Sequence, residues 1–281
     1  MTAVVATGGL GASSAADKAL QASAAFWFVT AVIGQWAFLY YIAAFYGPST
    51  FSGDFQAWGK NTLLSGGYRP GDTVGNLTFA AHALLAGIIA FGGALQLVPQ
   101  VRARAPAFHR WNGRVFLLTA SGLSLAGFYL VWVRGTGSGL VSSIAISING
   151  LLILGFAALA WRAARARAFA VHRRWAMRLY LVSNAQWFMR VGFFAWFMVS
   201  RPLAVKGLDG AFFIAWSFGC YLVPLAVLEL YLRAKDGAGP SGRFAMAGGL
   251  FVLTALMGVG MVGFTIFSQR ILSGAPVGLP G

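Results

Sequence analysis

The chain has 281 residues, of which 58% are hydrophobic and 10% are charged, and its mean hydropathy is +0.72. Soluble domains of this length are less apolar, so the composition predicts an integral membrane protein. The formal net charge of +15 is concentrated in short loops, where anionic lipid headgroups are the expected partner and nucleic acid is not.

Seven apolar runs follow one another along the chain, each near the roughly 20 residues that a helix needs to cross a bilayer. The runs are Ala24–Tyr46, Val74–Val98, Gly113–Val133, Leu140–Trp161, Met177–Val199, Ala211–Leu232 and Phe244–Phe267. Apolar residues lie on all sides of each run, so helical hydrogen bonds must satisfy the backbone. The predicted fold is an all-α, polytopic bundle of seven transmembrane helices.

Basic residues in the connecting loops predict the orientation. One set of loops carries Arg102, Arg104, Arg110, Arg114, Arg162, Arg165, Arg167, Arg173, Arg174, Arg178, Arg233, Lys235 and Arg243. The opposite set carries Lys60, Arg69, Arg134, Arg201, Lys206 and Arg270. Because Lys and Arg concentrate on the cytoplasmic side, we expect the N-terminus to be cytoplasmic and the C-terminus outside.

The domain organisation is simple. Residues 1–23 are rich in Ala, Gly, Ser and Thr and are expected to be disordered. Residues 24–270 form the membrane domain, and residues 271–281 form a short tail. The start of the chain lacks the pattern of a cleaved signal peptide. Cys220 is the only cysteine, which excludes a disulfide and a thiolate metal site within one chain.

Two similar strings begin the third and the fifth predicted spans. The first is His109-Arg-Trp-Asn-Gly-Arg114, and the second is His172-Arg-Arg-Trp-Ala-Met-Arg178. Each places a His, a Trp and an Arg at the same depth on helices that run in the same direction. The hairpins 74–133 and 140–199 are therefore candidates for a repeat.

Two histidines at one depth are suited to hold the iron of a haem b between them. Arginines near them would pair with the haem propionates: Arg110, Arg114, Arg173 and Arg178, with Arg174 beside them. A plainer alternative makes the same strings interface anchors, with Trp at the membrane surface and Arg on lipid phosphates.

Arg190 is the most costly residue to place in a membrane, because it lies deep within the fifth predicted span. Gln186 shares its helix face, and His82 and Asn149 reach a similar depth from other spans. We expect these four residues to form a polar cluster in the outer half of the bundle. No acidic residue lies at this depth, so an anionic or quinone-like ligand is one partner for Arg190, and backbone carbonyls are the other.

Three stretches carry a resemblance to known proteins: "AAHALLAGIIAFGGALQLVP", "PAFHRWNGRVFLLTASGLSLAGFYL" and "VHRRWAMRLY". Between about Asn76 and Arg190 the chain resembles a family of predicted bacterial multi-pass membrane proteins of unknown function, which implies location in the bacterial inner membrane. The histidines on alternate spans also look like those of transmembrane diheme cytochromes b. That likeness implies electron transport, but Asn149 stands where a histidine would face His82, so it implies one inner haem at most.

These patterns leave three functions open. The first is a haem-b-binding redox protein that uses His109 and His172. The second is a transporter or sensor that binds a ligand at the outer polar cluster. The third is an accessory subunit of a membrane complex. The chain contains no constellation typical of a hydrolase or an ATPase, so no catalytic residue is predicted.

Overall fold

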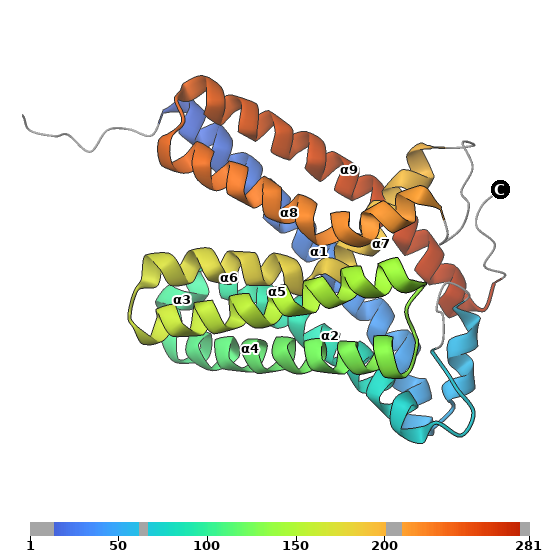
Figure 1. Cartoon of the computed structure of the whole chain (residues 1–281). Coiled ribbons are helices and arrows are strands. Elements are labelled where there is room, and N and C mark those ends of the chain that lie inside the picture. The colour runs from blue at the N-terminus through green and yellow to red at the C-terminus, as the bar shows by residue number, and fades with distance from the viewer. Residues whose placement is uncertain (1–13, 62–66, 201–209, 276–281) are drawn as a thin grey trace, which may run out of the picture.

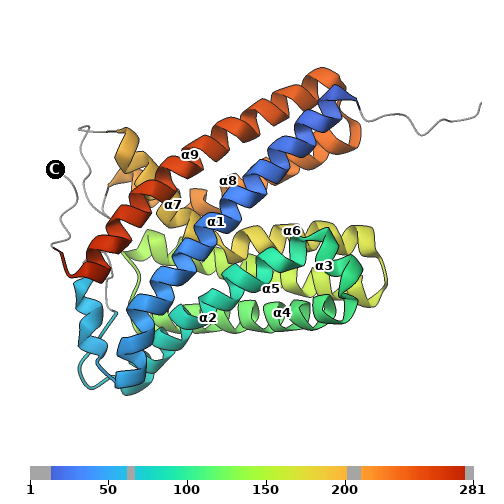
Figure 2. The ribbon, with the colours of Figure 1, turned by 180° about the vertical axis from the view of Figure 1, so that it is seen from behind.

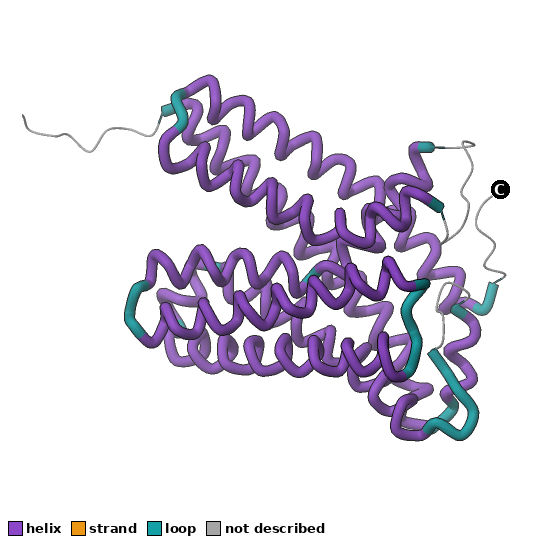
Figure 3. The backbone as a smooth tube through the Cα atoms, in the orientation of Figure 1, coloured by secondary structure: helices purple, strands orange, loops and turns teal. Residues whose placement is uncertain are grey.

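A computed structural model describes residues 14–61, 67–200 and 210–275, and this part of the chain is helical throughout, without strands (Figures 1 and 3). The elements are α1 (Ala15–Ser52), the 3-10 helix η1 (Phe55–Lys60), α2 (Thr73–Leu97), α3 (Pro99–Arg104), α4 (Pro106–Phe128), the π-helical turn η2 (Tyr129–Val133), α5 (Leu140–Arg165), α6 (Phe169–Ser183), α7 (Ala185–Val199), α8 (Ala211–Gly237) and α9 (Pro240–Ser273).

The helices form two groups. α2, α4, α5 and α6 pack side by side as a four-helix bundle, and α8 and α9 form a second group with the first half of α1, in which α8 also contacts α5 and α6 (Figure 1). α1 belongs to both groups, because it packs along α9 and then crosses to α2, as the reverse view shows (Figure 2). α7 lies between the groups and packs against α8 and α9.

Six helices are long and apolar enough to cross a membrane: α1, α2, α4 with η2, α5, α8 and α9. The predicted fifth span, Met177–Val199, is not among them, because the chain breaks at Asn184 into two 15-residue helices, α6 and α7. Asn184 donates its side-chain amide to the carbonyl of Tyr180 at 2.8 Å, which competes with helix continuation. The prediction of seven unbroken spans is therefore corrected to six long helices and one broken helix.

The N-terminal boundary also differs from the prediction. α1 begins at Ala15 because Ser14 and Asp17 form a capping box, in which each side chain accepts from the backbone N–H of the other residue. Residues 15–23 are thus helical, whereas residues 1–13 lie outside the described part. Residues 276–281 of the predicted tail, and the loop residues Arg201 and Lys206, also lie outside it.

The strongly basic connections gather at one end of the molecule, which we call the basic end. It contains α3, the α5–α6 connection, the α8–α9 connection and the start of α1 (Figure 1). The first connection after α1, including η1, lies at the opposite end. The arrangement agrees with the predicted alternation of loops, while the orientation of the termini in a membrane stays a prediction.

Candidate functional site

The structure brings His109 and His172 together near the basic end. Both lie at the fourth position of their helices, α4 and α6, and the pKa of His109 is lowered by partial burial and then by the positive charges of Arg102 and His172. α4 starts with Pro106 at its first position, which suits the fixed backbone angle of proline. Gln96 at the end of α2 then donates to the carbonyl of His109 at 3.0 Å and fixes that turn against α2.

Hydrogen bonding defines the state of His172. Its Nδ1 atom lies 2.9 Å from the carbonyl oxygen of Ala160 on α5, and a carbonyl can only accept, so Nδ1 carries the proton. In the neutral ring the lone pair is then on Nε2. This is how metal-ligating histidines are usually oriented. The Nδ1 atom of His109 is buried without a hydrogen-bond partner among the described residues, so this ring is the less constrained of the two.

The repeated strings share one internal contact. The guanidinium of Arg114 stacks over Trp111, and that of Arg178 stacks over Trp175, each 4.7 Å from the ring centroid. These cation–π pairs stiffen the helix start that carries each histidine. The similarity supports the predicted relation between the two hairpins at their histidine-bearing ends, although the second hairpin contains the break at Asn184.

Two of the arginines at this site bind carboxylates of α8. Arg178 holds Glu229 through two bonds of 2.7 and 2.9 Å, and Arg174 holds Asp236 at 2.6 Å. Arg178 is predicted to pair with a haem propionate, but in this structure its guanidinium is bound to the carboxylate of Glu229. Arg110 and Arg173 are exposed, and neither has a carboxylate partner within the described ranges.

The bundle is closely packed next to the pair. A Cβ added at Gly92 would lie 2.9 Å from Oδ1 of Asn112, whose amide donates to the Gly92 carbonyl, also at 2.9 Å. At Gly93 a Cβ would lie 2.8 Å from Phe116 and 3.1 Å from Tyr180. These glycines let α2 approach α4 and α6, as small residues do in membrane bundles.

The predicted outer cluster does not form a single group. His82 lies against α4, where a Cβ at Gly127 would be 3.7 Å from its ring. Asn149 donates to the carbonyl of Val182 at 3.2 Å, next to the helix break. Gln186 is exposed. His82 and Asn149 therefore have different neighbours, and the side chain of Gln186 is exposed.

Arg190 turns toward α1. Its guanidinium donates to the carbonyl of Gln186 at 2.7 Å and stacks over the ring of Phe38, with 4.9 Å to the centroid. A carbonyl and an aromatic face thus take the place of the missing carboxylate. A backbone carbonyl is one of the two partners predicted for Arg190, and the ring of Phe38 is an addition that the structure supplies.

Polar residues outside the predicted cluster meet near the helix break. Tyr180 donates to Oε1 of Gln35 at 2.9 Å, while Nε2 of the fully buried Gln35 has no partner in the described part. Nε1 of Trp187, also buried, is likewise unpaired there. The ring of Trp187 lies next to Gly34, the residue before Gln35, because a Cβ added at Gly34 would be 2.7 Å from that ring. Two unsatisfied donors therefore occur at one contact between α1 and α7.

A second unforeseen feature lies at the other end of the molecule. Arg134, only 2% exposed, donates to Asp72 at 2.9 Å, to the carbonyl of Gly67 at 3.0 Å and to Oδ1 of Asn76. We call these four residues the loop clamp. The loop clamp ties the connection between α4 and α5 to the segment that precedes α2 and to the first turn of α2. The donation from Arg134, together with the backbone N–H of Gly75, holds the pKa of Asp72 below its ordinary value of 3.8.

Within the described ranges, no group of three or more His, Cys, Asp or Glu side chains is placed to hold a metal ion.

Comparisons with known proteins identify the family and nothing closer. No curated protein and no solved structure matches the chain. The family model described as "Predicted membrane protein (DUF2306)" matches residues 79–232, more than half of the 281 residues. The match contains the bundle helices, the histidine pair and most of α8. Together with six membrane-length helices, it makes this chain a multi-pass membrane protein of the DUF2306 family.

Proposed function

We propose that this protein is a membrane redox protein that binds one haem b between His109 and His172. The observation that carries the proposal is the matching position of His109 and His172 in the first turns of α4 and α6 of one bundle, with Nδ1 of His172 held by a backbone carbonyl. That bond leaves Nε2 as the nitrogen available to a metal. A haem b bound there would supply one-electron transfer.

The surrounding chain supports the proposal in two ways. A Trp–Arg stack lies in the turn after each histidine, and the ring direction of His172 is set by its bond to the carbonyl of Ala160. Arg110 and Arg173 directly follow the histidines and are free of carboxylates in the described structure, so they are the arginines we assign to the propionates. Arg178 and Arg174 instead attach α6 to α8.

Absorbance spectroscopy tests this function directly. Protein purified in detergent from haem-replete cells should show a Soret band, and dithionite should produce a sharp reduced α band. Replacing either His109 or His172 by alanine should remove both bands, while His82→Ala, the matched control, should keep them. Size-exclusion chromatography establishes that each variant is folded. A colourless wild-type protein, or bands that survive both replacements, would refute the proposal.

A second candidate function rests on the contact between α1 and α7. Arg190 has no carboxylate partner in the described structure, and Gln35 and Trp187 contribute two buried, unpaired donors nearby. Buried donors without partners are costly, so a ligand with carbonyl or anionic oxygens would be stabilised there. This candidate is a carrier or sensor of a quinone-like molecule.

Ligand-induced thermal stabilisation distinguishes the second candidate from the first. A short-chain quinone should raise the melting temperature of the wild type but not that of Arg190→Leu or Gln35→Met. Arg270→Leu removes an exposed arginine from the end of α9 and should respond like the wild type. If Arg190→Leu is stabilised as strongly as the wild type, this candidate is wrong.

A further inference from the structure

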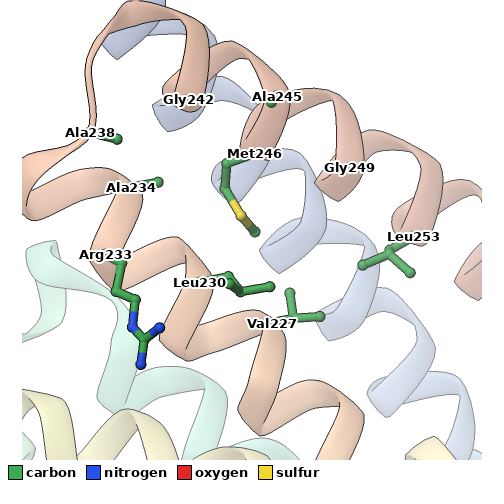
Figure 4. A pocket seen from close by; sticks show the side chains of 10 residues that line it. All are labelled: Val227, Leu230, Arg233, Ala234, Ala238, Gly242, Ala245, Met246, Gly249 and Leu253. Atoms are coloured by element: carbon green, nitrogen blue, oxygen red, sulfur yellow. The ribbon is translucent and has the colours of Figure 1, made fainter.

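A hollow of about 540 Å³ lies between α8 and α9, away from the histidine pair and the helix break. Figure 4 shows Val227 and Leu230 of α8 facing Met246 and Leu253 of α9 across it. Alanines and glycines form most of the remaining wall, and Arg233 is its only charged residue. We call this hollow the α8–α9 groove.

Small residues create the groove. Gly249 has nothing within 4 Å of the position that a Cβ would occupy, so the space beside it is open. The lining runs from Val227 to Ala238 on one helix and from Gly242 to Leu253 on the other. At 1.5 Å per residue each wall is about 17 Å long, close to the roughly 15 Å of one leaflet of the hydrocarbon core.

Charge distinguishes the basic end of the groove from its surroundings. Three arginines near this end are neutralised by carboxylates: Arg174 by Asp236, Arg178 by Glu229 and Arg243 by Asp17. Arg233 is exposed, and the described residues offer it no carboxylate. Arg233 is thus the charged residue that lines the apolar trough, and the exposed Lys235 follows two residues further along α8.

From this combination we infer that the α8–α9 groove binds one anionic phospholipid. One acyl chain lies along the groove, and the phosphate pairs with Arg233. From Arg233 to Val227 the α8 wall supplies about 9 Å of apolar contact at 1.5 Å per residue, and a guanidinium binds phosphate oxygens through paired, charge-assisted hydrogen bonds. The inference does not depend on haem or on a quinone, because none of their residues lines the groove.

Native mass spectrometry of the full-length protein tests the inference. The protein is extracted from vesicles that contain equal amounts of phosphatidylglycerol and phosphatidylcholine with identical chains. The wild type should retain one lipid, with phosphatidylglycerol favoured about fivefold, as expected for one basic residue near an anionic headgroup. Arg233→Gln should retain lipid without that preference.

Two glycine variants test the position of the chain. Gly249→Leu places a side chain in the groove and should abolish retention of the lipid. Gly248→Leu is the matched control: its Cβ position is equally open, but it does not line the groove, so retention should persist. Because Arg233 is exposed, its replacement should leave folding intact even if Gly249→Leu does not fold.

Three results would overturn the inference. The first is retention by Gly249→Leu equal to that of the wild type. The second is an unchanged phosphatidylglycerol preference in Arg233→Gln. The third is a dimer that forms in place of lipid binding and disappears in Gly249→Leu, since the groove would then be an interface between two copies of the chain.

Discussion

Replacing Arg134 by methionine removes the cation of the loop clamp while keeping a long apolar side chain. In the wild type this guanidinium is almost completely buried and binds Asp72, Asn76 and the carbonyl of Gly67. The variant leaves the carbonyl and the carboxylate without their charged donor. The connection between α4 and α5 should then separate from the start of α2.

The magnitude follows from the burial of the partners. Removing one member of a buried ion pair costs about 3–5 kcal/mol. The side chain of Asp72 is 32% exposed, so water replaces part of the lost contact. We therefore expect the low end, about 3 kcal/mol, which corresponds to a fall of about 6–12 °C in melting temperature for a chain of this size.

Tryptophan fluorescence during heating in detergent measures the effect. Arg270→Met is the control, because Arg270 is an exposed arginine at the end of α9. Arg134→Lys should give an intermediate value, since lysine keeps the charge but lacks the planar fork that binds three partners. A melting temperature of Arg134→Met within about 2 °C of the control would refute the reasoning, because the clamp would then contribute under about 1 kcal/mol.

Three further predictions concern pH, packing and an ion pair. The pKa of Asp72 is lower in the folded protein than its ordinary value of 3.8, so the Asp72 carboxylate stabilises the fold above that pH, and this stabilisation is lost as the pH falls below about 4. The melting temperature of Asp72→Asn should therefore fall less over this pH range than that of the wild type. Gly260→Ala should lower the free energy of unfolding by about 1–3 kcal/mol, because the added Cβ would meet a backbone carbonyl of α7. Gly258→Ala has open space around its Cβ and should leave the free energy of unfolding unchanged, which urea or thermal unfolding can compare. Glu229→Gln should cost about 1 kcal/mol, since its partner Arg178 is only partly buried, and a thermal loss no larger than that of a remote surface variant would contradict the pairing.

The long helices could be predicted from the sequence because bilayer-length apolar runs leave a chain few other structures. The break at Asn184 is not predicted from the sequence, because Met177–Val199 contains no proline. Its single glycine, Gly192, lies inside α7 and not at the break. The available signal was the pair Ser183–Asn184, whose side chains compete for backbone hydrogen bonds. Apolarity outweighed this signal in the prediction.

Side-chain pairing was harder to predict than the helices. Depth along a helix predicts that His109 and His172 lie at one level, and the structure has each of them in the first turn of its helix. The same reasoning grouped His82 with Arg190, but depth does not specify the direction in which a side chain points around its helix. Arg134 was counted only as a loop charge, since its partner Asp72 is 62 residues away in sequence.

The break at Asn184 also has a mechanical consequence. The helix below it, α6, belongs to the four-helix bundle, and the helix above it, α7, packs on α8 and α9. Asn184 is thus a covalent joint between the two groups of helices. α6 is a lever of about 22 Å at 1.5 Å per residue, so a rotation of about 10° at the joint would displace its far end by about 4 Å. His172 and His109 both belong to the bundle, so such a rotation would move them together and would instead change the distance between α6 and α8, which the ion pairs of Arg174 and Arg178 span.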